Sequence, residues 1–496
     1  MRSSKVPADK LEATLLETRT ASPDKWYRVA GMAAGVGLFA WFIVLVRNGL
    51  MAWFDGDDLM NLHYYWSRPW SALLKANLEF WSSYYRPGGG LFYRLIYAAW
   101  GFHPLPFRIA VLALLSVNFV LLAVVVWQLT KSRWGVLIAL LLIGINPTFS
   151  AAYFDTGTIY DILAYAFFWA GFALYVHLRQ AGRPLGWGAL VLVFLLYAGA
   201  LESKEIAVTF PVAVGLYELV WHPPATWKPS ALGRWIWQEG RLAVIGSVAA
   251  IAYFLGKRYG PDSLWLLSSY RPQYSPAAYF RSLSTYFREL VYQPVHVNSV
   301  EFSTLLAAMV TLAAVTRRRC LLWGFGFIAL GVLPLAFIPA RGGFAYMVPA
   351  VGWAVYVAGL LDWLIEALAG RRVWLQRAAQ AGLFIALFVV LAPWQQKWIG
   401  MHAHAALDMQ GHDRHFIDQI RALIPSPRKS AHILLLTDAE GLDNYDVYFV
   451  IRLYYGDPTL QVHRMKVFRD YHEQPVLKSY DYLLDWKDGR FFLVNK

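Results

Sequence analysis

The chain has 496 residues, of which 58% are hydrophobic, and its mean hydropathy is positive at +0.39. A single soluble core of this size would not bury so much apolar surface, so the composition excludes an ordinary soluble protein. The net charge of +13 comes largely from lysines and arginines that cluster in short loops between apolar runs. Basic residues in such loops orient membrane helices, so the charge does not indicate a nucleic-acid partner.

Apolar runs follow one another along most of the chain and predict an all-α polytopic membrane protein. A bilayer core requires about 20 apolar residues per helix, and about eleven runs meet that requirement. They lie near 29–46, 107–130, 134–150, 157–178, 185–201, 205–221, 241–257, 302–316, 321–340, 344–366 and 378–396. We therefore expect a cytoplasmic N-terminal segment at 1–28 and a transmembrane domain at 29–398.

The distribution of basic residues predicts how these helices are oriented. One set of alternate loops holds most of the loop lysines and arginines, and translocation across the membrane disfavours such residues. This set contains Lys131, Arg133, Arg179, Arg183, Lys228, Arg234, Arg241, Arg317, Arg318, Arg319, Arg371, Arg372 and Arg377. We expect the basic loops to face the cytoplasm of a cell with an inner (plasma) membrane. The opposite loops and the C-terminal part then face outward.

Three outward segments are long enough to have structure of their own, and one of them, residues 258–301, is similar in composition to the first outer loop. The first outer loop, residues 47–106, is rich in Trp, Tyr, Pro and Gly and contains the acids discussed below. Such a composition favours short helices that lie at the membrane interface. Residues 399–496 lose the membrane character, and 432–437 (HILLLT) has the pattern of a buried strand. We expect a small extracytoplasmic α/β domain at 399–496.

An adjacent carboxylate pair, Asp57 and Asp58, follows the first apolar run. Two carboxylates beside hydrocarbon are costly, so the pair indicates proton transfer, metal binding or substrate recognition. One carboxylate can take the proton of an acceptor hydroxyl while its neighbour binds the acceptor or a divalent cation. We assign no metal ligand, and a divalent cation is an alternative use of the pair. The preceding Asp55 is explained equally well as a helix cap.

Arg86 lies in the same outer loop, between two tyrosines and the sequence Pro-Gly-Gly-Gly. Proline and three glycines predict a turn with a flexible backbone. An arginine held between aromatic rings and such a backbone suits a phosphate, because guanidinium offers bidentate contacts. The glycines do not predict a nucleotide loop, since no strand precedes them and no Gly-Lys-Ser/Thr follows.

Further charged residues occur at the predicted outer ends of helices. Lys204 and Glu205 interrupt an apolar setting, where charges are expensive unless they are paired or functional. A local ion pair within 202–205 is one explanation, and a position in the outer cleft beside Asp57 is the other. Asp155 precedes another helix, where it acts either as a cap or in the cleft. Arg341, with Tyr346 nearby, supplies another cation at this level or contacts lipid headgroups.

These elements occur in an order that resembles the GT-C membrane glycosyltransferases, and most of all the protein O-mannosyltransferase branch and the tetratricopeptide-bearing transmembrane O-mannosyltransferases. The similarity covers residues 29–366. It rests on the carboxylate pair, on Asn118 and Arg341, and on the segments SYYRP (83–87), LFYRLIY (91–97), WGFHP (100–104), SKEIAVTFP (203–211) and AYMVPAVG (345–352). The chain departs from the family at Arg108, where a histidine is usual, and no tetratricopeptide repeats follow.

The resemblance implies an enzyme that moves a sugar from a polyprenyl phosphate to an acceptor hydroxyl at the outer face, with inversion at the anomeric carbon. The acceptor would be a protein or a glycolipid. Asp57 would be the general base, and Asp58 would orient the acceptor. The expected substrate-binding residues are Arg86, Lys204, Glu205, Arg341, Tyr346 and Asp155, of which the three cations would stabilise the lipid phosphate as it leaves.

Two other functions fit parts of the pattern. A polytopic transporter also has many helices with intramembrane charges. Against a transporter, the charged residues collect at one predicted face, and no pair of broken helices occurs in matching halves. A lipid-linked oligosaccharide polymerase or ligase would share the chemistry and differ in the length of its donor.

Overall fold

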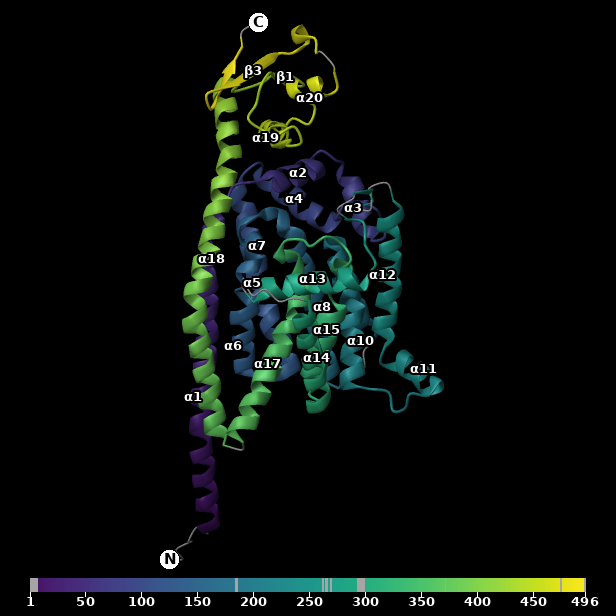
Figure 1. The fold of residues 1–496 in the computed structure, drawn as a ribbon, viewed down its shortest axis with the longest axis vertical. Coiled ribbons are helices and arrows are strands. Elements are labelled where there is room, and N and C mark those ends of the chain that lie inside the picture. The colour runs from purple at the N-terminus through teal and green to yellow at the C-terminus, as the bar shows by residue number, and fades with distance from the viewer. Residues whose placement is uncertain are drawn as a thin grey trace, which may run out of the picture.

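The structure is a computed structural model that describes residues 8–182, 186–260, 263, 266–267, 270–291, 299–370, 372–472 and 475–494. Residues 1–7 of the expected N-terminal segment, together with Arg183 and Arg371 of the expected basic loops, lie outside the described residues. A helical bundle forms most of the molecule, and a small domain with a β-sheet lies at the C-terminal end (Figure 1). The predicted fold class, an all-α membrane part with a C-terminal α/β domain, is therefore confirmed.

Helices account for nearly all regular structure before residue 424. They are α1 (Ala8–Val46), α2 (Gly56–Trp66), α3 (Trp70–Leu78), α4 (Pro87–Trp100), α5 (Pro104–Thr130), α6 (Arg133–Ala139), α7 (Ser150–Phe154), α8 (Ile159–Gln180), α9 (Trp187–Ser203), α10 (Phe210–Trp221), α11 (Pro229–Gln238), α12 (Arg241–Tyr259), α13 (Pro276–Leu290), α14 (Ser299–Thr316), α15 (Arg319–Leu330), α16 (Leu333–Ala336), α17 (Met347–Ala369) and α18 (Val373–Leu423). Short 3-10 or π-helical turns join several of them: η1 (Arg47–Met51), η2 (Leu140–Gly144), η3 (Pro147–Phe149), η4 (Thr156–Thr158), η5 (Glu205–Thr209) and η8 (Gly343–Tyr346).

Seven helices in the described part of the chain are long and apolar enough to cross a membrane, which makes the chain a multi-pass membrane protein. An eighth span results if the bent pair 133–144 and 147–154, which turns by 47°, counts as one. Two further apolar helices, α9 and α14, are shorter. The count from length and composition is thus below the roughly eleven spans expected, because the run at 134–150 is bent and the runs at 185–201, 205–221 and 302–316 form shorter helices.

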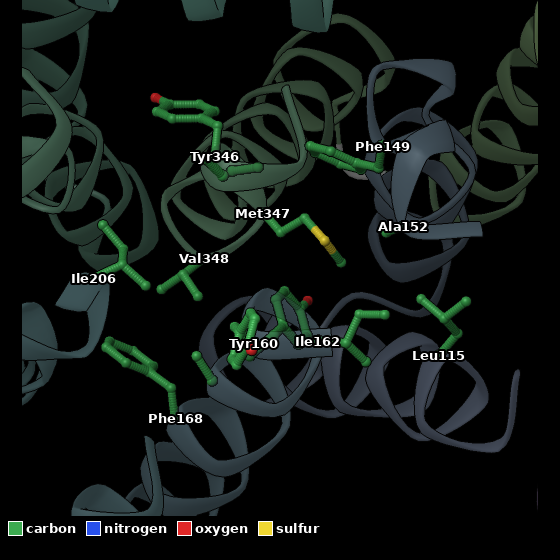
Figure 2. Packing of buried hydrophobic residues seen from close by; sticks show 14 of the residues in the cluster. Leu115, Phe149, Ala152, Tyr160, Ile162, Phe168, Ile206, Tyr346, Met347 and Val348 are labelled. Atoms are coloured by element: carbon green, nitrogen blue, oxygen red, sulfur yellow. The ribbon is translucent and has the colours of Figure 1, made fainter. Parts of the chain in front are cut away.

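The bundle encloses one large core of buried apolar side chains. Figure 2 shows part of this core, where side chains of α5, α7, α8, α17 and η5 point toward one another. Met347 of α17 lies on the side of Phe149 and of Ala152 of α7, and Val348 lies on the side of Ile206 of η5 and Phe168 of α8. This packing fixes η5 and the start of α8, which carry residues of the candidate site, and the start of α17, which directly follows the segment 341–346.

Residues 47–106 form a layer of short helices at one end of the bundle, as the sequence predicts. Helices α2, α3 and α4 lie there, between the bundle and the C-terminal domain (Figure 1). The three glycines after Pro87 belong to the first turns of α4 and do not form the expected flexible turn. Close packing explains them, because a Cβ on Gly89 would lie 2.2 Å from the ring of Tyr160 and one on Gly90 would lie 2.5 Å from Tyr65.

Helix α18 connects the bundle with the C-terminal domain. It continues without a break from Val373 through residue 399 to Leu423, so one helix includes both the last predicted span and the polar segment after it (Figure 1). Phe416 of this helix packs against Trp486 and Phe491 of the sheet, with ring centroids 5.1 and 5.9 Å apart. These contacts join the domain to the end of the helix.

The C-terminal domain contains two β-α-β units and a final hairpin. Its elements are β1 (His432–Leu435), α19 (Asp446–Tyr455), β2 (Gln461–Arg464), α20 (Met465–Asp470), η9 (Leu477–Ser479), β3 (Tyr482–Lys487) and β4 (Arg490–Leu493). The strand order is β2-β1-β3-β4, with β1 parallel to both neighbours and β4 antiparallel to β3. Strand β1 is the buried strand expected at 432–437, since a central parallel strand is apolar on both faces.

The packing of α4 predicts the effect of adding one methyl group at Gly89. Gly89→Ala forces the ring of Tyr160 or the start of α4 to move, and such overpacking costs about 1–3 kcal/mol of stability. We expect a lower midpoint of thermal unfolding in detergent. Gly37→Ala is the matched control, because nothing lies within 4 Å of a Cβ at Gly37. Equal midpoints for the two variants would contradict this packing.

Candidate active site

The carboxylate pair lies in the first turn of α2, and Asp55 caps the helix. The Asp55 side chain accepts the backbone N–H of Asp58 at 3.1 Å, and the Asp58 carboxylate accepts the N–H of Asp55 at 3.4 Å. This capping box satisfies donors that the start of a helix otherwise leaves unpaired. The capping role considered for Asp55 is therefore confirmed, and Asp58 shares it.

The two members of the pair have different surroundings. Asp57 is exposed and lines a cavity, whereas Asp58 is fully buried. Asp58 belongs instead to a cluster with Asp55 and Asp155, in which one carboxylate oxygen of each lies within 4.8 Å of the others. The hydroxyl of Tyr93 lies 3.3 Å from Asp58 Oδ1. Asp58 thus supports the cavity wall from behind, and Asp57 is the member that faces the open space.

Arg108 balances part of the charge in this acidic cluster. Its side chain is almost fully buried and donates a hydrogen bond of 2.7 Å to the carbonyl oxygen of Tyr153. Burial raises the pKa of Asp58 well above its usual range, and Asp55 and Asp155 raise it further, while Arg108 opposes them. Burial raises the pKa of Asp155 well above its usual range too. The cluster therefore retains protons that isolated carboxyl groups would lose.

The same three carboxylates are the described residues that best fit the divalent cation considered for this loop. Hard cations such as Mg²⁺ prefer carboxylate oxygens, and here three converge. Asp55, Asp58 and Asp155 would hold such an ion, and Asp57 lies outside the group. Arg108 already supplies positive charge at this cluster, so a bound cation would share the compensation with it.

A cavity of about 820 Å³ opens beside α2. Its polar wall contains most of the residues that the sequence singled out: Asp57, Arg86, Asp155, Lys204, Glu205 and Arg341. Its apolar wall comes from α12, α16 and the residues after α16: Phe254, Leu333, Pro334, Leu335, Phe337 and Ile338. Residues from the first loop and from four distant parts of the chain therefore meet around one space.

Arg86 has a strained backbone and a fully engaged side chain. Its φ is +34°, in the left-handed region that is unfavourable for residues with a Cβ. The guanidinium pairs with Glu205, with an Nη2 to Oε2 distance of 3.0 Å, and lies 4.8 and 5.3 Å from the rings of Tyr85 and Tyr160. Burial would raise the pKa of Glu205, but Arg86 together with Lys204 lowers it to about 2. The ion pair therefore stays charged across the physiological pH range.

Lys204 pairs with Asp161 of α8, and both side chains are largely buried. Lys204 has φ −160° and ψ 149°, so the backbone is extended between α9 and η5. Neighbouring side chains on an extended backbone point to opposite sides, which sends Lys204 toward α8 and Glu205 toward α4. Of the two explanations considered for these residues, the local pair within 202–205 is therefore wrong, because Lys204 and Glu205 pair with Asp161 and Arg86 on other segments.

Arg341 and Tyr346, both expected to bind substrate, have separate positions. Arg341 lines the cavity, and its guanidinium lies 3.9 Å from the ring centroid of Tyr270. Tyr346 is fully buried, stacks on Tyr286 with centroids 4.6 Å apart, and accepts a hydrogen bond of 3.0 Å from Trp353. Tyr346 is not among the described residues of the cavity wall, so its position is that of a packing residue behind it.

The sequence did not single out several residues that line the cavity. Lys257 at the end of α12 adds a fourth cation, and Asn61 and Tyr85 line the part near Asp57 and Arg86. Lys257 could have been found from its position in the sequence, since it follows an apolar run at the predicted outer end of that run. The pairing of Asp161 with Lys204 had no local signal, because the two residues lie on different helices.

The raised pKa of Asp58 predicts how stability depends on pH. The folded protein disfavours the ionised carboxylate, so the contribution of Asp58 to stability is greatest at low pH and declines as pH rises through its folded pKa. In Asp58→Asn the amide side chain does not titrate. The variant's unfolding midpoint in detergent should therefore vary less with pH than that of the wild type between about pH 5 and 8. Asp443→Asn, in an exposed loop, is the control. Parallel pH profiles for wild type and Asp58→Asn would contradict the prediction.

Comparisons with known proteins bear on the family. No family model matches the chain. Protein O-mannosyl-transferase Tmtc1 of Drosophila melanogaster is 30% identical over 239 residues, which are 46% of this chain and 26% of that protein. The chain thus spans about a quarter of the length of this curated relative. The crystal structure of ArnT from Cupriavidus metallidurans bound to undecaprenyl phosphate is 13% identical, with a TM-score of 0.45, and the match covers 94% of this chain and 97% of that one. The match with Tmtc1 confirms the predicted resemblance to transmembrane O-mannosyltransferases.

Proposed function

We propose that the chain is an inverting glycosyltransferase that moves a sugar from a polyprenyl-phosphate donor to an acceptor hydroxyl at the outer face of the cell's inner (plasma) membrane. One observation carries the proposal: an exposed carboxylate, Asp57, lies on the wall of a cavity that has both a charged and an apolar part. The resemblance to O-mannosyltransferases supports the reaction type.

The two parts of the cavity wall correspond to the two parts of the donor. A polyprenyl phosphate has a long hydrocarbon chain and a charged head. Phe254 and Leu333 line the apolar part, and both side chains are partly exposed. A hydrocarbon chain can therefore lie against these side chains, which water would avoid. The sugar phosphate then lies at the charged end.

The cations of the cavity are suited to a phosphate that becomes a leaving group. Arg86 and Lys204 are already paired with Glu205 and Asp161, so their positions are fixed before substrate binds. Arg341 adds positive charge across the cavity. Prearranged charges stabilise developing negative charge without reorganisation during the reaction. We assign these three cations to the donor phosphate and Glu205 to holding Arg86 in place.

Asp57 is assigned as the general base. Its carboxylate takes the proton of the acceptor hydroxyl as the acceptor oxygen attacks the anomeric carbon and the phosphate departs from the opposite side. This single displacement needs one base and inverts the anomeric centre. Asp58, behind the wall, and Asp155, on the wall, hold the start of α2 and of η4. Their role is to fix Asp57 and orient the acceptor, which is a protein or a glycolipid.

The orientation follows from the charge of the loops. The basic loops lie at the far end of the bundle from α2, for example at Arg234 of α11 (Figure 1). Basic loops remain in the cytoplasm, so α2, the cavity mouth and the C-terminal domain face outward. The donor is then used at the outer leaflet.

The base assignment predicts a specific loss in Asp57→Asn. General-base assistance contributes about 10² to 10⁴ in rate, so the amide should lower kcat by that factor while donor affinity stays nearly constant. Transfer from a polyprenyl-phosphate sugar is measured with purified protein in lipid nanodiscs. Asp443→Asn should remain fully active. A normal rate for Asp57→Asn would remove Asp57 from the mechanism, and donor transport without any covalent product would favour a transporter.

The phosphate assignment predicts a different loss in Arg86→Ala. Removing one partner of a desolvated charged contact costs about 2–5 kcal/mol, so donor binding should weaken by at least about 30-fold. Acceptor KM should change little. Arg281→Ala, on the exposed side of α13, is the control. Equal weakening for donor and acceptor would indicate a folding role for the Arg86–Glu205 pair.

A further inference from the structure

Helix α2 presents three different faces to its surroundings. Residues 57, 60, 61 and 64 line the cavity, and this spacing places them on one face of a helix. Leu59, Leu62 and Tyr65 are buried in the core. Gly56 and His63, which are seven residues apart and thus lie on one stripe, face α19 of the C-terminal domain. The helix that carries Asp57 is therefore held between the bundle and this domain.

The contact at the end of α2 is built from an aromatic and ionic cluster. The ring of His63 lies 5.5 Å from that of Tyr448 and 5.2 Å from that of Phe449. Arg452 donates from Nη1 to Nε2 of His63 at 3.0 Å. Burial lowers the pKa of His63 to about 4, and Arg452 contributes, so the imidazole is neutral and accepts this hydrogen bond at neutral pH.

The contact at the start of α2 is steric. A Cβ on Gly56 would lie 2.8 Å from Asp446 Oδ1, so glycine lets the first turn of α19 approach the residue before Asp57. Asp446 begins α19, and its backbone N–H donates to Asn444 Oδ1 at 2.8 Å. A third contact lies on α4, where the hydroxyl of Tyr97 donates to the carbonyl oxygen of Leu453 at 2.8 Å.

The loop before α19 is itself rigidly held. Arg464 of β2 is almost fully buried and pairs with Asp438, with an Nη2 to Oδ1 distance of 2.7 Å. It also donates to the carbonyl oxygens of Gly441 at 2.8 Å and Leu442 at 3.3 Å. One arginine therefore fixes the loop 438–446 to the sheet. Through these contacts the sheet fixes the position of α19, and α19 in turn contacts α2.

We propose that the C-terminal domain is a positioning element of the active site, in which α19 holds α2 from outside so that Asp57 points into the cavity. His63, Arg452 and Gly56 are the positioning residues. The role rests on the proposed function of Asp57. The domain acts on the chemical step and leaves the binding of the donor phosphate unchanged, because Lys204 and Arg341 lie on other elements and Arg86 lies at the start of α4, about three helical turns from the contact at Tyr97.

The test places a larger side chain at Gly56. The valine of Gly56→Val displaces either Asp446 or the start of α2, and small displacements of a catalytic group cost about 10- to 100-fold in rate. We expect kcat to fall by that factor and the KM for a polyprenyl-phosphate sugar to stay within about twofold. Hydrogen exchange of residues 56–66 should become faster, because α2 loses its outer support. Arg469→Ala, on the exposed surface of α20 in the same domain and outside the loop 438–446, is the control.

The double variant Gly56→Val/Asp446→Ala separates positioning from damage to α2 itself. Removing the Asp446 carboxylate makes room for the valine, so kcat and hydrogen exchange should return most of the way to the values of Asp446→Ala alone. A double variant as slow as Gly56→Val would overturn the positioning role. A Gly56→Val variant with wild-type kcat would overturn it as well. Absence of transfer by the wild type would overturn the proposed function together with this role.

Discussion

Two buried ion pairs determine how the cavity is built. Arg86 with Glu205 and Lys204 with Asp161 join α4, η5 and α8, whose residues are far apart in the sequence. Charges removed from water are stable only when they are paired and hydrogen-bonded, so each pair fixes the distance between its helices. Breaking either pair leaves a buried charge without compensation. The cavity wall is for that reason both charged and rigid.

The acidic residues near α2 differ in their positions and therefore in their proposed roles. Asp55, Asp58 and Asp155 form one cluster that retains protons beside Arg108, with Asp58 fully buried and Asp155 reaching the cavity wall, while Asp57 is exposed on that wall. A carboxylate in open space can exchange protons with an acceptor, and buried neighbours can hold its helix in place. The C-terminal domain adds a second support from outside. Support from both sides suits a base that must meet an acceptor at a fixed distance.

Much of this arrangement follows from sequence, and the remainder depends on contacts between distant residues. The apolar runs, the helical first loop and the strand at 432–435 were predictable because each has a local pattern. The gathering of charged residues at one end of the bundle was predictable as well. The partners of Lys204 and Glu205 were not, since an extended backbone turns both side chains away from local neighbours. The roles of the glycines after Pro87 and of Tyr346 depend on packing against other helices, which no local pattern encodes.

The central claim is that polyprenyl-phosphate donor and acceptor meet in this cavity and that the sugar leaves the lipid there. The most direct measurement follows both products of a polyprenyl-phosphate sugar incubated with the purified chain and outer-surface material from a deletion strain. The account predicts that free polyprenyl phosphate and glycosylated acceptor appear in equal amounts, with the anomeric configuration inverted. Consumption of donor with retained configuration, or movement of intact donor across the membrane without release of polyprenyl phosphate, would contradict it.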